Sequence, residues 1–151
     1  MMLRHSSRKA GDYDDNGLLK VPVVFWCGVL LQTRVWWLTG LGMASEHGGL
    51  WLSLLYPDTT QQLTGLVASV PALAVLFCYP VRGHLPLLAK GIYLLMLFAV
   101  AVLTAGDVLM LAGLLPGEQE TGWLSVCPDL ACLVMLWPDK RLREVFFTDK
   151  E

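Results

Sequence analysis

Four long runs of apolar residues, separated by short polar segments, dominate this chain. The runs cover residues 21–44, 63–81, 87–115 and 123–137. A helix that crosses the hydrocarbon core of a membrane needs about 20 consecutive apolar residues. The first three runs are about that long, and the fourth is shorter. The pattern therefore predicts membrane-spanning helices rather than the core of a soluble domain.

Composition agrees with this interpretation. Apolar residues make up 55% of the 151 residues and charged residues 16%, and the mean hydropathy is +0.54. Soluble domains are nearer to ~45–50% apolar and ~25% charged. The charged residues of this chain gather between the apolar runs, as they do in membrane proteins.

We therefore expect one all-α domain, an integral membrane bundle of about four transmembrane helices within residues 21–137. The expected spans are residues 21–44, 63–81, 91–111 and 123–137. Polar tails flank this domain at residues 1–20 and 138–151. The fourth span is the shortest, but basic side chains beyond its end can snorkel to the membrane surface and extend it. The apolar side chains of residues 145–147 can rest on that surface.

The connector between the first two spans, residues 45–62, contains a short apolar run of its own at residues 50–56. This run is too short to cross a membrane. We expect an interfacial or re-entrant segment here, anchored by the aromatic rings of Trp51 and Tyr56.

Pro71 lies near the middle of the second expected span. A proline inside a helix removes one backbone hydrogen bond and usually bends the helix. The sequence therefore predicts a kink at Pro71. Gly65 and Ser69 in the same span have the spacing of small residues that lets two helices approach closely.

Basic residues indicate the orientation. Of the 11 Lys and Arg residues, only Arg34 lies within a span; the others lie in the two tails and around the turn between the second and third spans. The other two connectors carry none. Because Lys and Arg accumulate on the cytoplasmic side, we expect an even number of spans with both termini in the cytoplasm.

Three ionisable residues stand inside the expected spans: Arg34, Asp107 and Asp129. Such a residue costs about 2.5–3.5 kcal/mol on insertion scales, so it usually has a partner or a role. With a rise of about 1.5 Å per residue, the Arg34 side chain can reach the level of either aspartate. We predict an ion pair of Arg34 with Asp129 or Asp107. The pair either holds the helices in register or serves an ion or proton pathway; alternatively Arg34 snorkels alone.

The sequence contains no complete catalytic or metal-binding motif. The four cysteines, all within apolar runs and without zinc-ligand spacing, are Cys27, Cys78, Cys127 and Cys132. We expect no catalytic residue, no metal and no cofactor. No basic stripe suits nucleic acid. We therefore expect a protein that is not an enzyme.

Several short strings, taken in order, resemble one known family. They are YDDNGLLKVP at residues 13–22, RVW at 34–36, LLYPD at 54–58 and VPAL at 70–73. With them the chain resembles the YfeZ-like inner membrane proteins of gammaproteobacteria, a family of unknown function. The resemblance implies a bacterial inner membrane location and assigns no activity.

Three classes of function fit these observations. The first is a non-enzymatic accessory or scaffolding protein that binds another membrane protein or a second copy of itself. The second is a small oligomeric transporter or channel component that uses Arg34 and the intramembrane aspartates. The third, a lipid-modifying enzyme, needs a catalytic constellation that the sequence lacks. Short loops and the absence of catalytic motifs favour the first.

Overall fold

The computed structural model describes residues 19–114 and 122–147, together with Gly11, Tyr13, Asp15 and Gly17, and this part of the chain is all-helical. Its elements are α1 (Val23–Gln32), α2 (Arg34–Ala44), α3 (Glu46–Leu55), α4 (Thr59–Cys78), the 3-10 turn η2 (Tyr79–Val81), α5 (Pro86–Leu111), α6 (Gly122–Leu136) and α7 (Lys140–Phe147). The expected all-α class is confirmed. Most of the expected N-terminal tail and the last four residues lie outside the described part.

Two helices are long and apolar enough to cross a membrane. Thr59–Val81, which joins α4 to η2, has 23 residues and a mean hydropathy of 1.8, and α5 has 26 residues and a mean hydropathy of 2.4. The other apolar helices are shorter, with 10 residues in α1 and 15 in α6. The three later runs become helices close to the expected limits, because each is apolar and bounded by turn residues.

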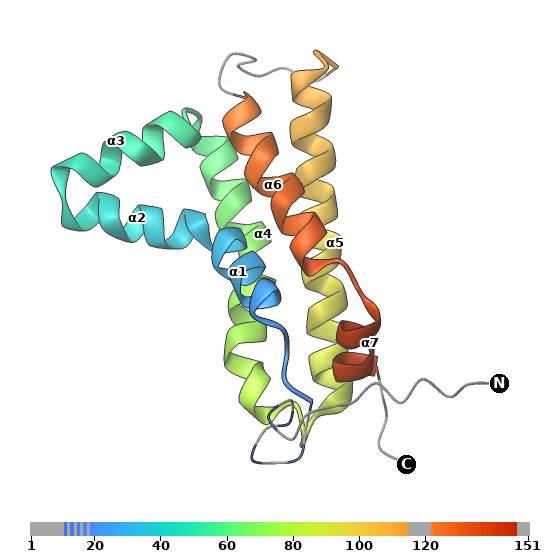
Figure 1. Ribbon diagram of the computed structural model, residues 1–151. Helices are drawn as coiled ribbons and strands as arrows, with labels where there is room; N and C mark the ends of the chain where they lie inside the picture. The colour runs from blue at the N-terminus through green and yellow to red at the C-terminus, as the bar shows by residue number, and fades with distance from the viewer. Residues whose placement is uncertain are drawn as a thin grey trace.

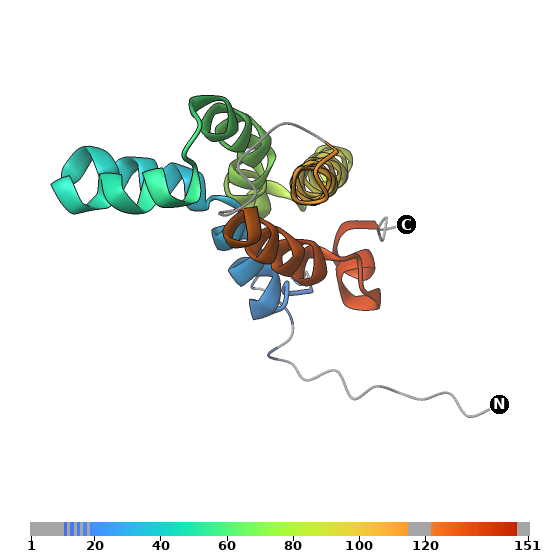
Figure 2. The same ribbon diagram turned by 90° about the horizontal axis from the view of Figure 1, so that it is seen from above.

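The long helices α4 and α5 lie side by side, and α1 and α6 pack against each other and against this pair (Figure 1). One end of the bundle carries Arg82, Lys90 and α7, and we call it the basic end. The other end, where α4 begins and α5 finishes, is called the far end. A hairpin made of α2 and α3 projects sideways from the bundle in both views (Figures 1 and 2).

The expectation of one continuous helix over residues 21–44 is wrong, because the helix breaks at Thr33. Thr33 has φ −84° and ψ 8° and ends α1, and α2 starts at the next residue in a new direction. The Thr33 hydroxyl donates to the carbonyls of Val29 and Leu30, at 3.1 Å each. A threonine hydroxyl that bonds back to the preceding turn competes with the helical backbone. Both halves are apolar, and the polar triplet of residues 32–34 between them coincides with the break.

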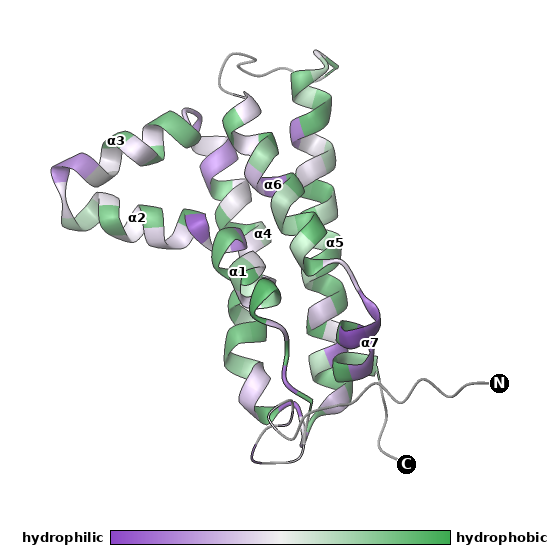
Figure 3. Cartoon of the chain, viewed as in Figure 1, coloured by the Kyte–Doolittle hydropathy of each residue, from purple (hydrophilic) through white to green (hydrophobic). Residues whose placement is uncertain are grey.

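The short apolar run at residues 50–56 forms most of α3, which folds back along α2. The tip of the hairpin, where Glu46 and His47 open α3, is hydrophilic and exposed (Figure 3). Its flanks expose large apolar side chains, namely Trp36, Trp37, Leu41, Met43, Leu50, Trp51 and Leu54.

Aromatic side chains close the basic end. Tyr93 of α5 stacks on Phe146 of α7 with centroids 4.5 Å apart and planes 3° apart, and both pack against Phe25 of α1. The Tyr93 hydroxyl donates to the carbonyl of Leu136 at 3.0 Å. The expectation that residues 145–147 rest on a membrane surface is therefore wrong for Phe146, which is buried because α7 turns its apolar face inward.

Pro71 is buried inside α4, which continues through it to Cys78. The expected kink stays a prediction. A second helical proline, Pro128, lies inside α6 and was not anticipated.

Gly28 sets the distance between α1 and α6. A Cβ at this position would lie 3.0 Å from Leu136 Cδ2 and 3.0 Å from Met135 Cβ, whereas a Cβ at Gly40 in the hairpin would meet nothing within 4 Å. We expect Gly28→Val to lower the free energy of unfolding by about 1–3 kcal/mol through overpacking. Thermal unfolding of purified protein, followed by helical circular dichroism, measures this. Gly40→Val is the matched control, and equal losses in both variants would contradict the packing argument.

Candidate functional site

The break at Thr33 leaves backbone carbonyls of α1 without helical N–H donors, and side chains supply the missing bonds. The carbonyl of Leu30 accepts from the Thr33 hydroxyl at 3.1 Å and from the Trp37 indole N–H at 3.2 Å. A backbone carbonyl at a helix end needs a partner, because one left unsatisfied away from water costs about as much as a lost hydrogen bond.

The next two carbonyls are satisfied from other positions. Arg34 Nη1 donates to the carbonyl of Leu31 at 3.3 Å. The carbonyl of Gln32 accepts from Ser69 Oγ, on α4, at 2.8 Å. The Ser69 hydroxyl also lies 2.6 Å from the carbonyl of Gly65, so its single proton is shared between two acceptors. The broken helix is thereby tied to α4.

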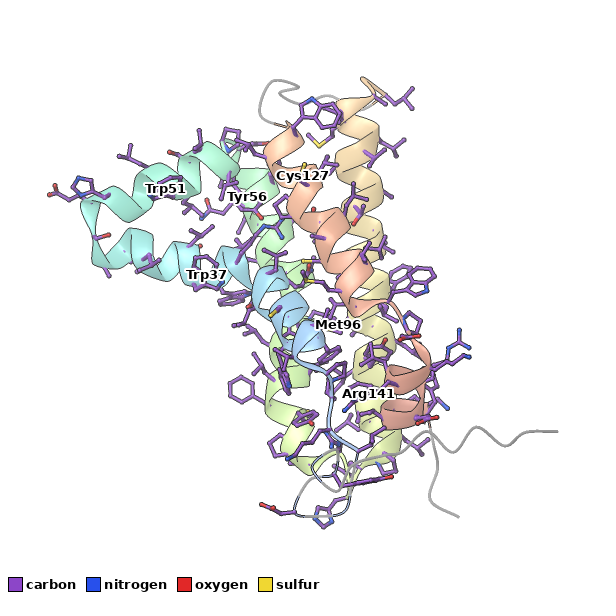
Figure 4. All side chains as sticks on the ribbon, in the orientation of Figure 1. Trp37, Trp51, Tyr56, Met96, Cys127 and Arg141 are labelled. Carbon is purple, nitrogen blue, oxygen red and sulfur yellow. The ribbon has the colours of Figure 1, made fainter. Side chains whose placement is uncertain are left out.

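Arg34 forms a buried ion pair with Asp129 of α6. The distance from Nη2 to Oδ1 is 2.5 Å, and the two side chains are 7% and 2% exposed. The guanidinium carbon also lies 5.8 Å from the ring centroid of Tyr56, the residue between α3 and α4. Figure 4 shows Tyr56 directed toward the bundle from the root of the hairpin. Arg34 thus links the root of the hairpin to α6.

Asp107 of α5 is the second carboxyl at this position. Its side chain lines the same cavity as those of Arg34 and Asp129. The structure therefore brings together Arg34, Asp107 and Asp129, with the direct ion pair going to Asp129. Pro71 lies elsewhere in α4 and takes no part in this cluster.

The cluster forms part of the wall of a cavity of about 350 Å³ between the helices. Eleven of its 17 lining residues are polar, although apolar atoms make up most of the lining surface. The polar residues are Gln32, Arg34, Tyr56, Asp58, Thr60, Gln61, Thr64, Ser69, Asp107, Ser125 and Asp129. The exposed residues Asp58 and Thr60 stand at the far end, and the buried Gln32 and Ser69 stand at the depth of the helix break. The cavity thus reaches inward from the far end.

Gln32 is the member of the cavity that sequence reasoning missed. Its side chain is 1% exposed, and neither its amide nitrogen nor its amide oxygen has a hydrogen-bond partner among the described residues. The available signal was the polar triplet of residues 32–34 inside an otherwise apolar run. Tyr56 and Ser69 also line the cavity. The sequence predicts only an interfacial anchor for Tyr56 and only helix packing for Ser69.

The two serines of the cavity lining are held by the backbone. Ser69 and Ser125 both donate to backbone carbonyls, and neither histidine of the described part of the chain lines the cavity. Within the described ranges, no three His, Cys, Asp or Glu side chains gather to hold a metal ion.

These features define a class: a helical protein with at least two helices of membrane-spanning length and a polar cavity within the bundle. The chain belongs to the family described as protein of unknown function (DUF2919), whose model matches residues 9–148. It is 34% identical over 142 residues to "Inner membrane protein YfeZ" of Escherichia coli (strain K12), an alignment that covers 92% of this chain and 93% of the relative. The predicted resemblance is confirmed. No solved structure matches the chain.

Removing one partner of the Arg34–Asp129 pair leaves the other as an unpaired buried charge. We expect Arg34→Ala to lower the free energy of unfolding by about 3–5 kcal/mol, and Arg34→Ala with Asp129→Ala to recover part of that loss. A double-mutant cycle by thermal or denaturant unfolding in detergent measures the coupling. The matched cycle of Arg34→Ala with Asp107→Ala should give a smaller interaction free energy. If the losses of Arg34→Ala and Asp129→Ala were strictly additive, the result would argue against the pair.

Proposed function

We propose that this chain is a non-enzymatic inner membrane protein with four crossings and both termini in the cytoplasm. The name of the Escherichia coli relative supports the location. The basic end then faces the cytoplasm, where Lys and Arg accumulate, and the far end faces outward. Two crossings are α4 with η2, and α5. The third is α6, whose 15 residues cover about 22 Å.

The remaining crossing is discontinuous. With 10 residues, α1 covers about 15 Å, or about half of a hydrocarbon core of about 30 Å. The α2–α3 hairpin supplies the rest of the path, because α2 leaves the bundle partway along α4 and α3 returns at the far end (Figure 1). A broken helix is tolerated at membrane depth only where protein buries it or where it lines a cavity. Residues 32–34 are buried, and Gln32 and Arg34 line the cavity, in keeping with this requirement.

We propose further that the protein works as an accessory subunit that binds another membrane protein through the α2–α3 hairpin. The observation that carries this proposal is the hairpin itself, which projects sideways with an apolar surface and a polar tip (Figures 1 and 3). Figure 4 shows Trp37 and Trp51 on its two arms. Lipid can cover the apolar flanks, but a charged tip within the outer leaflet needs a partner.

The charge at the tip favours a foreign partner over a second copy. Glu46 and His47 are exposed there. The outer connectors of this chain carry no Lys or Arg, so a second copy has no such cation to offer Glu46. The partner we propose is a helical membrane protein that presents a Lys or Arg to the tip and apolar side chains to the flanks.

A second candidate function is a component of a small transporter or channel. The polar cavity with Arg34, Asp107 and Asp129 favours it, since ionisable residues inside bundles mark ion and substrate pathways. Four short crossings leave little room for a complete pore, so this function requires self-association or a partner.

The topology can be tested with single cysteines in a cysteine-free background. Leu114→Cys should react with a membrane-impermeant maleimide in intact cells, whereas His84→Cys and Lys140→Cys should react only after the inner membrane is disrupted. These three positions lie at opposite ends of α5 and beyond α6. Labelling of Lys140→Cys in intact cells would mean that α6 does not cross, and the count of four would be wrong.

The accessory function can be tested by photocross-linking in the native membrane. A photoreactive residue at Trp51, on the hairpin, should capture one foreign membrane protein in stoichiometric amounts. The same residue at Phe98, equally exposed on α5, should not. Glu46→Gln should then reduce co-purification of that protein several-fold without changing the amount of folded chain. Cross-links only to lipid or to a second copy would overturn the accessory function.

A further inference from the structure

The charges around the cavity do not balance. Inside the cavity one cation, Arg34, faces two carboxyl groups, Asp107 and Asp129, and the Arg34 charge is already taken up by the close contact with Asp129. A negative charge on Asp107 is unfavourable in this desolvated position unless a positive charge accompanies it. Either a proton or a bound cation beside Asp107 can supply that charge.

Gln32 gives an independent indication of a missing ligand. Its side chain lines the cavity and is only 1% exposed. Neither its amide oxygen nor its amide nitrogen has a hydrogen-bond partner among the described residues. A buried amide without hydrogen bonds is unfavourable, so native proteins rarely keep one. Its oxygen can accept from a donor that enters the cavity, and its nitrogen can donate to a hydroxyl or carbonyl of the same molecule.

The size and walls of the cavity restrict what that molecule can be. A volume of about 350 Å³ is near the lower limit for small-molecule sites and far exceeds a bare ion. Among the described residues, no three His, Cys, Asp or Glu side chains gather as they do at a site built for a metal ion. The ring of Tyr56 borders the cavity, and an aromatic face attracts organic ammonium groups.

We infer that the cavity is a binding site for a small organic cation, a compound with one or more ammonium groups that enters from the far end. The ammonium group binds Asp107, and the amide oxygen of Gln32 accepts a second hydrogen bond from the ligand. Asp58, exposed at the far end, attracts cations toward the entrance. Arg34 does not repel the ligand from this position, because Asp129 neutralises it.

This inference goes beyond the accessory function and does not depend on it. Ligand binding uses Asp107 and Gln32 inside the bundle, whereas the proposed docking uses the hairpin tip. A purified chain without any partner can therefore test the cavity alone.

Four probes of similar size and different charge separate the alternatives. They are 1,4-diaminobutane, butylamine, butan-1-ol and butyrate, each titrated into the full chain in phosphatidylcholine nanodiscs and followed by calorimetry and by the thermal unfolding midpoint. We expect the two amines to bind and to raise the unfolding midpoint. The neutral alcohol and the anion should do neither.

Two variants connect binding to the proposed residues. Asp107→Asn should raise the Kd for the amines by at least about tenfold. Gln32→Met should weaken binding several-fold while leaving the unfolding midpoint of the empty protein unchanged or higher, because the amide has no protein partner to lose. Glu46→Gln removes an acidic residue from the same side of the protein but outside the cavity, and it should leave the affinity unchanged.

Three results would overturn the inference. The first is binding of butyrate or butan-1-ol in preference to the amines. The second is equal amine binding by the wild-type chain and by the folded Asp107→Asn variant. The third is an unfolding midpoint that responds to pH but to none of the amines, which would mean that a proton alone balances the cavity.

Discussion

The guanidinium of Arg34 connects α1, α6 and the root of the hairpin. It supplies a donor to α1 at the carbonyl of Leu31, pairs with Asp129 of α6 and faces the ring of Tyr56. These contacts form where the helix breaks at Thr33, a point at which side chains donate to the carbonyls of residues 30–32. The position of the hairpin against the bundle and the polar wall of the cavity both involve this one paired cation.

The two ends of the bundle differ in a way that follows from their side chains. At the basic end, Phe25, Tyr93 and Phe146 pack ring against ring. At the far end, α4 and α5 carry threonine, glutamine and aspartate toward the interior, and these residues line the cavity. A molecule held beside Asp107 is therefore nearer to polar side chains on the far side than to the aromatic cluster on the basic side.

The sequence predicted the later helices well because their boundaries have local causes. The expected span 123–137 became Gly122–Leu136, and the expected span 91–111 lies inside Pro86–Leu111. The break in the first run was not predicted, because α1 and α2 are both apolar and only the polar triplet of residues 32–34 between them coincides with it. The Arg34 pairing was left open between two aspartates because helical rise gives the height of a residue but not the direction of its side chain. Phe146 was assigned to a membrane surface because only tertiary packing reveals the ring of Tyr93 that covers it.

The ion pair also constrains the order in which the protein is made. Arg34 and Asp129 are 95 residues apart in the chain. At a translation rate of about 5–20 residues per second, α6 follows α2 out of the ribosome roughly 5–20 s later. During that interval the arginine has no Asp129, and the hairpin has no α6 to anchor its root. In the proposed topology of four crossings, the first segment therefore enters the membrane before Asp129 has been made, and the hairpin gains its contact with α6 only when the last apolar helix arrives.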